Sequence, residues 1–245
     1  MVPPSDCATG PQAYFIVKSL APTARPPQTQ IFSKTSPPAI AKTVFFCYNI
    51  SIMMFLRTVH KMSLSELKKK CEACKKCPLH ETRTNCVFGV GSENATLMFV
   101  GEAPGEKEDL SGVPFVGRAG QLLDKFLEAV GISRDEVYIA NILKCRPPKN
   151  RDPLPEEEAQ CIDFLREQVA TINPKIIVCL GRISAMKLIK PDFKITQEHG
   201  EWFKKGNYLM TAVYHPAALL RDPRKKEDML LDMQKIKARL TEEEE

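Results

Sequence analysis

The sequence has no apolar run long enough to span a membrane and no glycine loop of the kind that binds nucleotide phosphates. Its most apolar stretch, residues 44–56, is shorter than the roughly 20 residues that a membrane-spanning helix needs, and it contains Asn49 and Ser51. The motifs G-x-x-x-x-G-K-[ST] and G-x-G-x-x-G are also missing. We therefore expect no membrane association and no site for a nucleoside triphosphate or a dinucleotide.

An excess of charge of one sign is missing from most of the chain. The net charge of +5 arises in residues 1–62, which carry six basic side chains and one acidic side chain, whereas residues 63–245 carry 29 of each. Local basic segments remain at 144–151 (KCRPPKNR) and 221–226 (RDPRKK). The overall charge neither supports nor excludes a polyanionic partner, and contacts with phosphates must come from such segments.

Residues 1–62 differ in composition from the rest of the chain. They hold eight of the nineteen prolines, which is typical of a disordered segment. Met62 precedes a helical pattern capped by Ser63 and is a plausible start. We interpret residues 1–62 as a disordered extension or a misassigned start; organelle import is disfavoured because the segment is not clearly amphipathic. Residues 63–240 then form one domain, and 241–245 an acidic tail.

Apolar runs and helical patterns alternate from residue 63 onward. Strands are predicted at 96–100, 137–143, 175–181 and 208–214, and helices at 63–70, 117–130, 155–171, from Ser184 and at 224–240. This alternation predicts an α/β fold of three layers, αβα, with a central, mostly parallel four-stranded sheet. Ligands bind at the carboxyl ends of strands in such folds. The polar or glycine residues found there are Glu102, Asn141, Gly181 and His215.

Residues 101–120 form an unusually long connection between a strand and a helix, since such connections run about 2–6 residues. The segment contains five glycines, which let the backbone approach a ligand closely, together with one aromatic residue, Phe115. Its carboxylates, Glu102 and Glu108 among them, would repel a phosphate unless a metal intervened. We predict that this loop forms one wall of a ligand pocket.

The nine cysteines are clustered, which is unlike the even scatter of a secreted disulfide scaffold and indicates a metal site in a reducing compartment. The candidate ligands are Cys71, Cys74, Cys77, Cys145 and Cys161. The first three imitate a ferredoxin run, but position 81 is Glu81 where that run needs a further cysteine. Zinc also accepts four thiolates, although only one C-x-x-C half is present. The remaining cysteines are interpreted as small hydrophobic residues.

With these motifs in view, the chain resembles the family 4 uracil-DNA glycosylases, the iron–sulfur branch of the uracil-DNA glycosylase superfamily. The resemblance covers about residues 71–222. It rests on CKKCPLHETRT, GEAPGEKEDLSGVPFVGRAGQLLD, VYIANILKCRPPKNRDP, the downstream Cys161 and YHPAALLR, which occur in family order. Agreement of several unrelated strings makes the resemblance specific.

The resemblance implies a DNA repair enzyme that hydrolyses the N-glycosidic bond of uracil in single- or double-stranded DNA and leaves an abasic site. It also implies a structural 4Fe-4S cluster, held by Cys74, Cys77, Cys145 and Cys161, with Cys71 as an extra residue. The expected form is a monomer in a prokaryotic cytoplasm, associated with the nucleoid. No peptide of the Q-x-x-hydrophobic-x-x-aromatic-aromatic form supports contact with a sliding clamp.

The resemblance also implies roles for individual residues. Phe115 would stack on the flipped base, and the Asn141 amide would hydrogen-bond the uracil edge. His215 would donate a hydrogen bond to the departing uracil anion. Leu219 would enter the gap that the base leaves in the stack. Viewed singly, these residues also suit structural roles: a core aromatic, a capping asparagine and a core leucine.

One position departs from the best-known members of the superfamily. Ala103 stands where they carry an aspartate that positions the attacking water. The water must then be held by the Glu102 or Ala103 backbone or by Glu108, which alternatively lines the pocket where the methyl group of thymine would sit. The predicted catalytic residues are therefore His215, Glu108 and Glu102.

Three other interpretations remain open. The chain could be a ferredoxin-like electron carrier, although its cysteine run is incomplete. It could be a cluster- or zinc-bound module that binds nucleic acid without cutting it. It could also be a glycosylase for another deaminated base, such as hypoxanthine.

Overall fold

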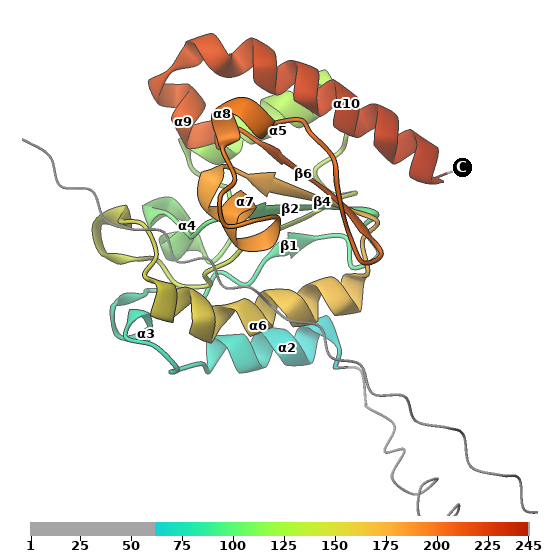
Figure 1. Ribbon diagram of the computed structural model, residues 1–245. Helices are drawn as coiled ribbons and strands as arrows, with labels where there is room; N and C mark the ends of the chain where they lie inside the picture. The colour runs from blue at the N-terminus through green and yellow to red at the C-terminus, as the bar shows by residue number, and fades with distance from the viewer. Residues whose placement is uncertain (1–61, 245) are drawn as a thin grey trace, which may run out of the picture. The chain divides into compact units, whose positions relative to one another are not determined.

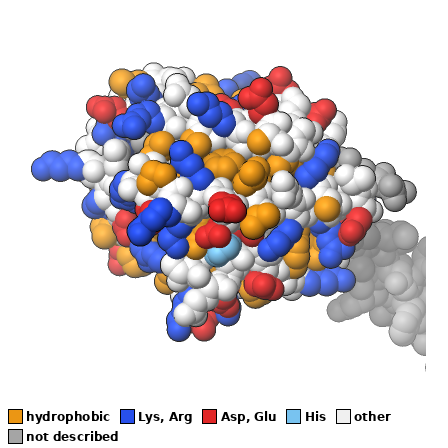
Figure 2. Space-filling view, turned by 90° about the horizontal axis from the view of Figure 1, so that it is seen from above, with side chains coloured by type: hydrophobic (Ala, Val, Ile, Leu, Met, Phe, Trp, Pro, Cys, Tyr) orange, Lys and Arg blue, Asp and Glu red, His pale blue; other side chains and the backbone are white. Residues whose placement is uncertain are grey.

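A computed structural model describes residues 62–244; the predicted N-terminal extension, apart from Met62, lies outside the described residues. None of the described helices is long and apolar enough to cross a membrane. Basic and acidic side chains are interspersed around an apolar band on the face in Figure 2. Side chains of both charge signs therefore occur on this face.

A six-stranded sheet of order β1-β3-β2-β4-β6-β5 forms the middle layer (Figure 1). Its four central strands are parallel: β2 (Leu97–Gly101), β3 (Tyr138–Asn141), β4 (Ile176–Leu180) and β6 (Tyr208–Val213). They are the four predicted strands. Two short antiparallel strands, β1 (Val90–Gly91) and β5 (Phe203–Lys205), extend the edges and were not predicted. Both are too short to give a periodic sequence pattern.

Helices cover both faces of the sheet. The described helices are α2 (Leu64–Glu72), α3 (Leu79–Thr82), α4 (Glu106–Ser111), α5 (Arg118–Ala129), α6 (Pro155–Ile172), α7 (Arg182–Leu188), α8 (Ile195–Glu198), α9 (Pro216–Arg221) and α10 (Lys226–Glu244), with 3-10 turns at Pro148–Asn150 and Pro223–Lys225. In Figure 1, α2 and α6 lie below the sheet, whereas α5 and α10 lie above it. This is the predicted three-layer αβα arrangement. The last helix continues to Glu244, so most of the predicted acidic tail is helical.

The alternation of side chains along β2 builds two cores. Met98 and Val100 pack in the core that contains residues of α2 and α6, and Leu97 and Phe99 pack in the core that contains residues of α5 and α10. All four side chains are fully buried. Burial of one such side chain stabilises the fold by about 1.5–3 kcal/mol. A sheet buried on both faces gives its strand ends fixed positions.

The first described helix begins with the predicted cap. The Ser63 hydroxyl accepts a hydrogen bond from the Glu66 amide (3.2 Å), and the Glu66 carboxylate accepts one from the Ser63 amide (2.9 Å). This reciprocal capping box satisfies two amides that the helix itself cannot pair. Helix α2 therefore has its own start signal directly after Met62.

We expect a chain that begins at Met62 to fold as the full-length protein does, because α2 is capped locally and the described cores are built from later residues. Thermal unfolding should give a midpoint within about 3 °C of the full-length value, which corresponds to about 1 kcal/mol. Loss of a cooperative transition would show that residues 1–61 pack on the domain.

Candidate functional site

A cleft of about 600 Å³ opens at the carboxyl ends of the parallel strands. The loops after β2, β3, β4 and β6 supply its walls, as expected for an open α/β sheet. The structure brings together in this cleft the six predicted substrate-binding residues: Glu102, Ala103, Glu108, Phe115, Asn141 and His215.

The Asn141 amide is buried in the cleft wall without a partner for its oxygen. The residue ends β3, pairs in register with Gly101 of β2, and is only 1% exposed. Its Oδ1 atom has no hydrogen-bond partner among the described residues. A buried acceptor left unpaired costs about 1–3 kcal/mol. Such an atom in a cleft wall is suited to receive a ligand's hydrogen bond.

Phe115 presents a buried ring beside this amide. Its backbone lies in the left-handed region (φ 53°), which costs a bulky residue about 1–3 kcal/mol. The ring centroid lies 5.8 Å from that of His215. A Cβ atom at Gly101 would lie 2.7 Å from the ring and 2.3 Å from Asn141 Oδ1, so only glycine fits there.

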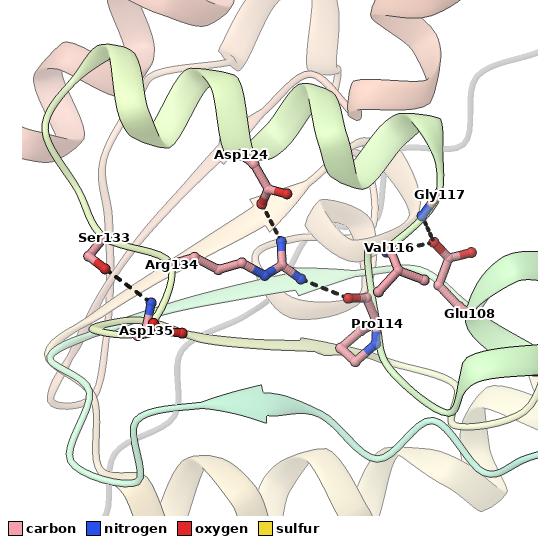
Figure 3. Close-up of polar contacts among 8 residues, drawn as sticks. All are labelled: Glu108, Pro114, Val116, Gly117, Asp124, Ser133, Arg134 and Asp135. Carbon is pink, nitrogen blue, oxygen red and sulfur yellow. Dashed lines mark hydrogen bonds and ion pairs between the residues drawn. The ribbon is translucent and has the colours of Figure 1, made fainter.

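Glu108 holds the loop that carries Phe115. Its Oε1 atom accepts hydrogen bonds from the amides of Val116 (3.0 Å) and Gly117 (2.8 Å), as Figure 3 shows. One oxygen of the predicted catalytic carboxylate is therefore engaged by the backbone. This contact favours a structural role for Glu108 within the cleft wall.

His215 is neutral and carries its proton on the free ring nitrogen. It caps α9, and its Nδ1 atom accepts a hydrogen bond from the Ala217 amide (3.1 Å), so the proton of the neutral ring lies on Nε2. Burial, and next the charge of Arg221, lower the pKa of His215 to about 4, against an opposing effect of Glu108. At neutral pH the cleft thus has a neutral imidazole with an N–H donor.

Glu102 follows β2 directly and is half-buried in the cleft. Burial, and next the charge of Asp152, raise the pKa of Glu102 to about 7, whereas Arg182 acts in the opposite direction. A carboxyl group that titrates near neutral pH in a cleft is a candidate proton acceptor.

The structure buries Leu219, the residue predicted to enter the DNA stack. Its side chain is 0% exposed and packs in the core with residues of α5 and α10, because the turn of α9 directs it inward. Ala217, Ala218 and Arg221 of the same segment line the cleft instead.

Other charged residues that line the cleft were not predicted individually from the sequence. They are Arg151, Asp152, Arg182 and Arg221. Two of them, Arg151 and Arg221, lie in the basic segments 144–151 and 221–226, which the sequence indicated as candidate phosphate contacts. Asp152 and Arg182 are distant in sequence, yet Arg182 Nη2 lies 3.2 Å from Asp152 Oδ2.

A second, small cavity is lined by sulfur-bearing side chains. Its cysteines are Cys71, Cys74, Cys77, Cys145 and Cys161. Within residues 62–244, no group of three or more His, Cys, Asp or Glu side chains is arranged to hold one metal ion. Arg83 Nη1 donates a hydrogen bond to Cys145 Sγ (3.1 Å), and the Lys144 amide donates one to Cys161 Sγ (3.3 Å).

Cys71 differs from the other four cysteines of this cavity. Its Sγ atom lies 3.0 Å from Sγ of Cys86, with which it shares a hydrogen bond.

Burial is the largest cause that raises the pKa of the Cys145 thiol to about 11 and that of the Cys161 thiol to about 12. These two thiols therefore need nearby positive charge or a metal to lose their protons.

Lys144 places a buried amine next to this cavity, and burial lowers the pKa of Lys144, whereas the neighbouring Cys161 acts in the opposite direction. It is 0% exposed, and its Nζ atom donates hydrogen bonds to the Asn141 carbonyl (2.8 Å) and to Gln168 Oε1 (2.6 Å). No carboxylate of the described chain forms an ion pair with it. A buried cation is costly unless an anion compensates it, so Lys144 suits an anionic group among the sulfurs.

Comparison with known proteins identifies the family. The model of the Uracil DNA glycosylase superfamily matches residues 88–237. The type-4 uracil-DNA glycosylase of Archaeoglobus fulgidus is 47% identical over 184 residues, covering 71% of this chain and 92% of the relative. That of Thermotoga maritima is 45% identical over 173 residues, covering 69% and 88%. A type-5 uracil-DNA glycosylase of Pyrobaculum aerophilum is 35% identical over 146 residues, covering 53% and 64%. The chain therefore belongs to the uracil-DNA glycosylase superfamily, among the type-4 enzymes.

Proposed function

We propose that the protein excises uracil from DNA by hydrolysing the N-glycosidic bond and leaves an abasic site. The observation that carries this proposal is the unpaired amide oxygen of Asn141, buried beside the ring of Phe115, which in turn lies near His215. Uracil offers an N–H donor next to a carbonyl acceptor, which a carboxamide matches with one hydrogen bond each way. Cytosine presents a different pattern along the same edge. The names of the relatives support the same substrate.

The cleft requires the base to leave the duplex before it can bind, since a stacked uracil is unreachable. Phe115 would stack on the flipped ring, and Asn141 would bind its edge. The rim arginines Arg151, Arg182 and Arg221 would contact phosphates of either single- or double-stranded DNA.

Cleavage then depends on stabilising the leaving group. As the bond between the sugar carbon and the base nitrogen lengthens, its electron pair moves onto the uracil ring and its carbonyl oxygen. The Nε2–H of His215 donates a hydrogen bond to that oxygen and stabilises the anion. Water adds to the sugar carbon and loses a proton to the Glu102 carboxylate, which takes the place of the aspartate missing at Ala103.

The test is incubation of the protein with oligonucleotides that contain uracil, thymine, cytosine or hypoxanthine, followed by alkaline cleavage of abasic sites. We expect strand breaks at uracil. Breaks only at hypoxanthine would assign a different base, and binding without breaks would indicate a non-catalytic DNA-binding module.

We further propose that Cys74, Cys77, Cys145 and Cys161 hold a 4Fe-4S cluster. The four residues line one cavity, and Cys145 and Cys161 already accept hydrogen bonds at sulfur. The negative charge of a thiolate-bound cluster would favour the protonated form of buried Lys144, whose pKa burial lowers. The thiolates of such a cluster bind different irons, so they need not surround one ion. When bound, the cluster would cross-link the segment after α2, the loop after β3 and α6.

Replacing His215 by alanine should lower the single-turnover rate on uracil about 100- to 1000-fold, or about 3–4 kcal/mol, because one donor to the developing anion is removed. Binding of uracil-free DNA, measured in parallel by fluorescence anisotropy, should not change. A variant that cleaves uracil at nearly the parent rate would make His215 a structural residue.

Replacing Asn141 by aspartate should abolish uracil cleavage through loss of base recognition, whereas the His215 variant loses stabilisation of the leaving anion. The change converts an amide donor into a carboxylate acceptor, so uracil loses its partner and cytosine gains one. Cleavage of uracil and cytosine substrates is measured side by side. Undiminished uracil cleavage would show that the Asn141 amide does not read the base.

The uracil cleavage rate should rise with pH around pH 7, because the Glu102 carboxyl is protonated below its pKa of about 7 and accepts a proton only above it. His215, with a pKa of about 4, stays neutral throughout and adds no second step. Single-turnover rates from about pH 5.5 to 8.5 measure the profile. Glu102→Gln should be slower and lack the rise; a flat parent profile would exclude this role.

Purified protein should be brown and contain iron, and Cys145→Ala or Cys161→Ala should lose cluster and solubility together. Cys179→Ala is the matched control, because Cys179 is buried in β4 and does not line the cavity. Iron analysis and visible absorbance are the measurements. Colourless protein with stoichiometric zinc would contradict the cluster.

A further inference from the structure

Arg134 lies outside the cleft yet contacts the loop that carries Phe115. It sits in the turn between α5 and β3, and its side chain is 27% exposed. Its Nη2 atom donates a hydrogen bond to the Pro114 carbonyl (2.8 Å), and its Nη1 atom pairs with the Asp124 carboxylate on α5. Figure 3 shows the guanidinium between α5 and the loop, joined to both.

The loop needs such support because Phe115 has a left-handed backbone, which a bulky residue rarely adopts (φ 53°). The peptide groups on both sides of Phe115 are held by charged side chains. Arg134 holds the Pro114 carbonyl before it, and Glu108 holds the amides of Val116 and Gly117 after it. In Figure 3 the two charged groups reach the loop from opposite directions.

The loop packs so closely against α5 that its backbone has little room to move. A Cβ atom at Gly120 would lie 1.8 Å from the Phe115 carbonyl oxygen, so the loop backbone sits directly on the helix. The Phe115 ring in turn lies against Gly101 at the end of β2. A small displacement of the Pro114 carbonyl would therefore move the ring in the cleft.

Arginine suits this position better than lysine would. Its planar guanidinium serves two acceptors in fixed directions at once, here the Asp124 carboxylate and the Pro114 carbonyl. The turn that presents Arg134 is shaped locally, because Ser133 Oγ accepts a hydrogen bond from the Asp135 amide (3.4 Å). The contact thus joins the turn after α5 to the loop before its start.

We propose that Arg134, oriented by Asp124, is a positioning residue for the base-stacking ring. By holding the Pro114 carbonyl, it keeps Phe115 in the left-handed conformation that presents the ring to the cleft. Arg134 itself touches neither base nor sugar. This inference rests on the proposed uracil excision, with Phe115 as the stacking residue.

The test compares Arg134→Gln with Arg166→Gln in the protein beginning at Met1. Arg166 is a matched control, because it pairs with Asp163 (2.9 Å) on the exposed face of α6, away from the loop. We expect Arg134→Gln to lower the single-turnover rate on uracil about 10- to 100-fold, as misplacement of a substrate-positioning group does. Arg166→Gln should change it less than about 2-fold, as expected for an exposed pair.

A double-mutant cycle separates positioning from general destabilisation. In a Phe115→Ala background, Arg134→Gln should cost less than about 2-fold, because the ring through which it acts is gone. An equal loss in both backgrounds would overturn the proposal. Arg134→Lys, which keeps the charge but offers no planar fork, should show an intermediate loss.

We call the hold of Arg134 on the Pro114 carbonyl the clamp. Hydrogen exchange of the Val116 and Gly117 amides tests this clamp without a measurement of activity. Exchange should be about 10-fold faster in Arg134→Gln, and in Asp124→Asn if the first variant does not fold, and unchanged in Arg166→Gln. If the parent cleaves uracil and exchange is equal in all variants, the clamp is wrong and the proposed function stands. If the parent cleaves no uracil but exchange differs, the clamp stands and the proposed function fails.

Discussion

The missing side chain at Gly101 lets two groups of the cleft, the Asn141 amide and the Phe115 ring, meet at the ends of two neighbouring strands. A Cβ atom there would overlap the Asn141 amide and the Phe115 ring, and the parallel register sets Gly101 directly beside Asn141. A second glycine acts in the same way for His215. Gly181 adopts φ 91°, and a Cβ atom there would lie 2.7 Å from His215 Cβ. Any larger residue at either position would force the recognition groups apart.

The loop after β3 connects the two candidate sites. Asn141 faces the cleft, Lys144 is buried behind it, and Cys145 lines the sulfur cavity. The side chain of Lys144 holds the Asn141 carbonyl, while its amide contacts Cys161. Under the proposed function, a cluster in the cavity would stiffen the strand end that carries Asn141. It would then influence substrate recognition without taking part in the chemistry.

The sequence was sufficient for the four parallel strands and for most of the cleft residues. Strand ends of an α/β sheet converge on one edge, so Asn141 and His215 could be placed together before any coordinates. The direction of Leu219 could not be predicted, because tertiary packing decides which face of a short helix is buried. The contact of Arg134 with the Phe115 loop could not be predicted either. A single arginine in a turn gives no signal until the fold brings its guanidinium to a loop twenty residues earlier in the chain.

The proposed function requires that the buried amide of Asn141 and the ring of Phe115 form a pocket for a flipped uracil. Its most direct test is a crystal structure of the protein soaked with free uracil. We expect a base stacked on Phe115, with its N–H and carbonyl on the Asn141 amide and a second carbonyl oxygen within hydrogen-bond distance of His215 Nε2. Uracil bound elsewhere, or a base in the cleft whose edge does not meet Asn141, would contradict it.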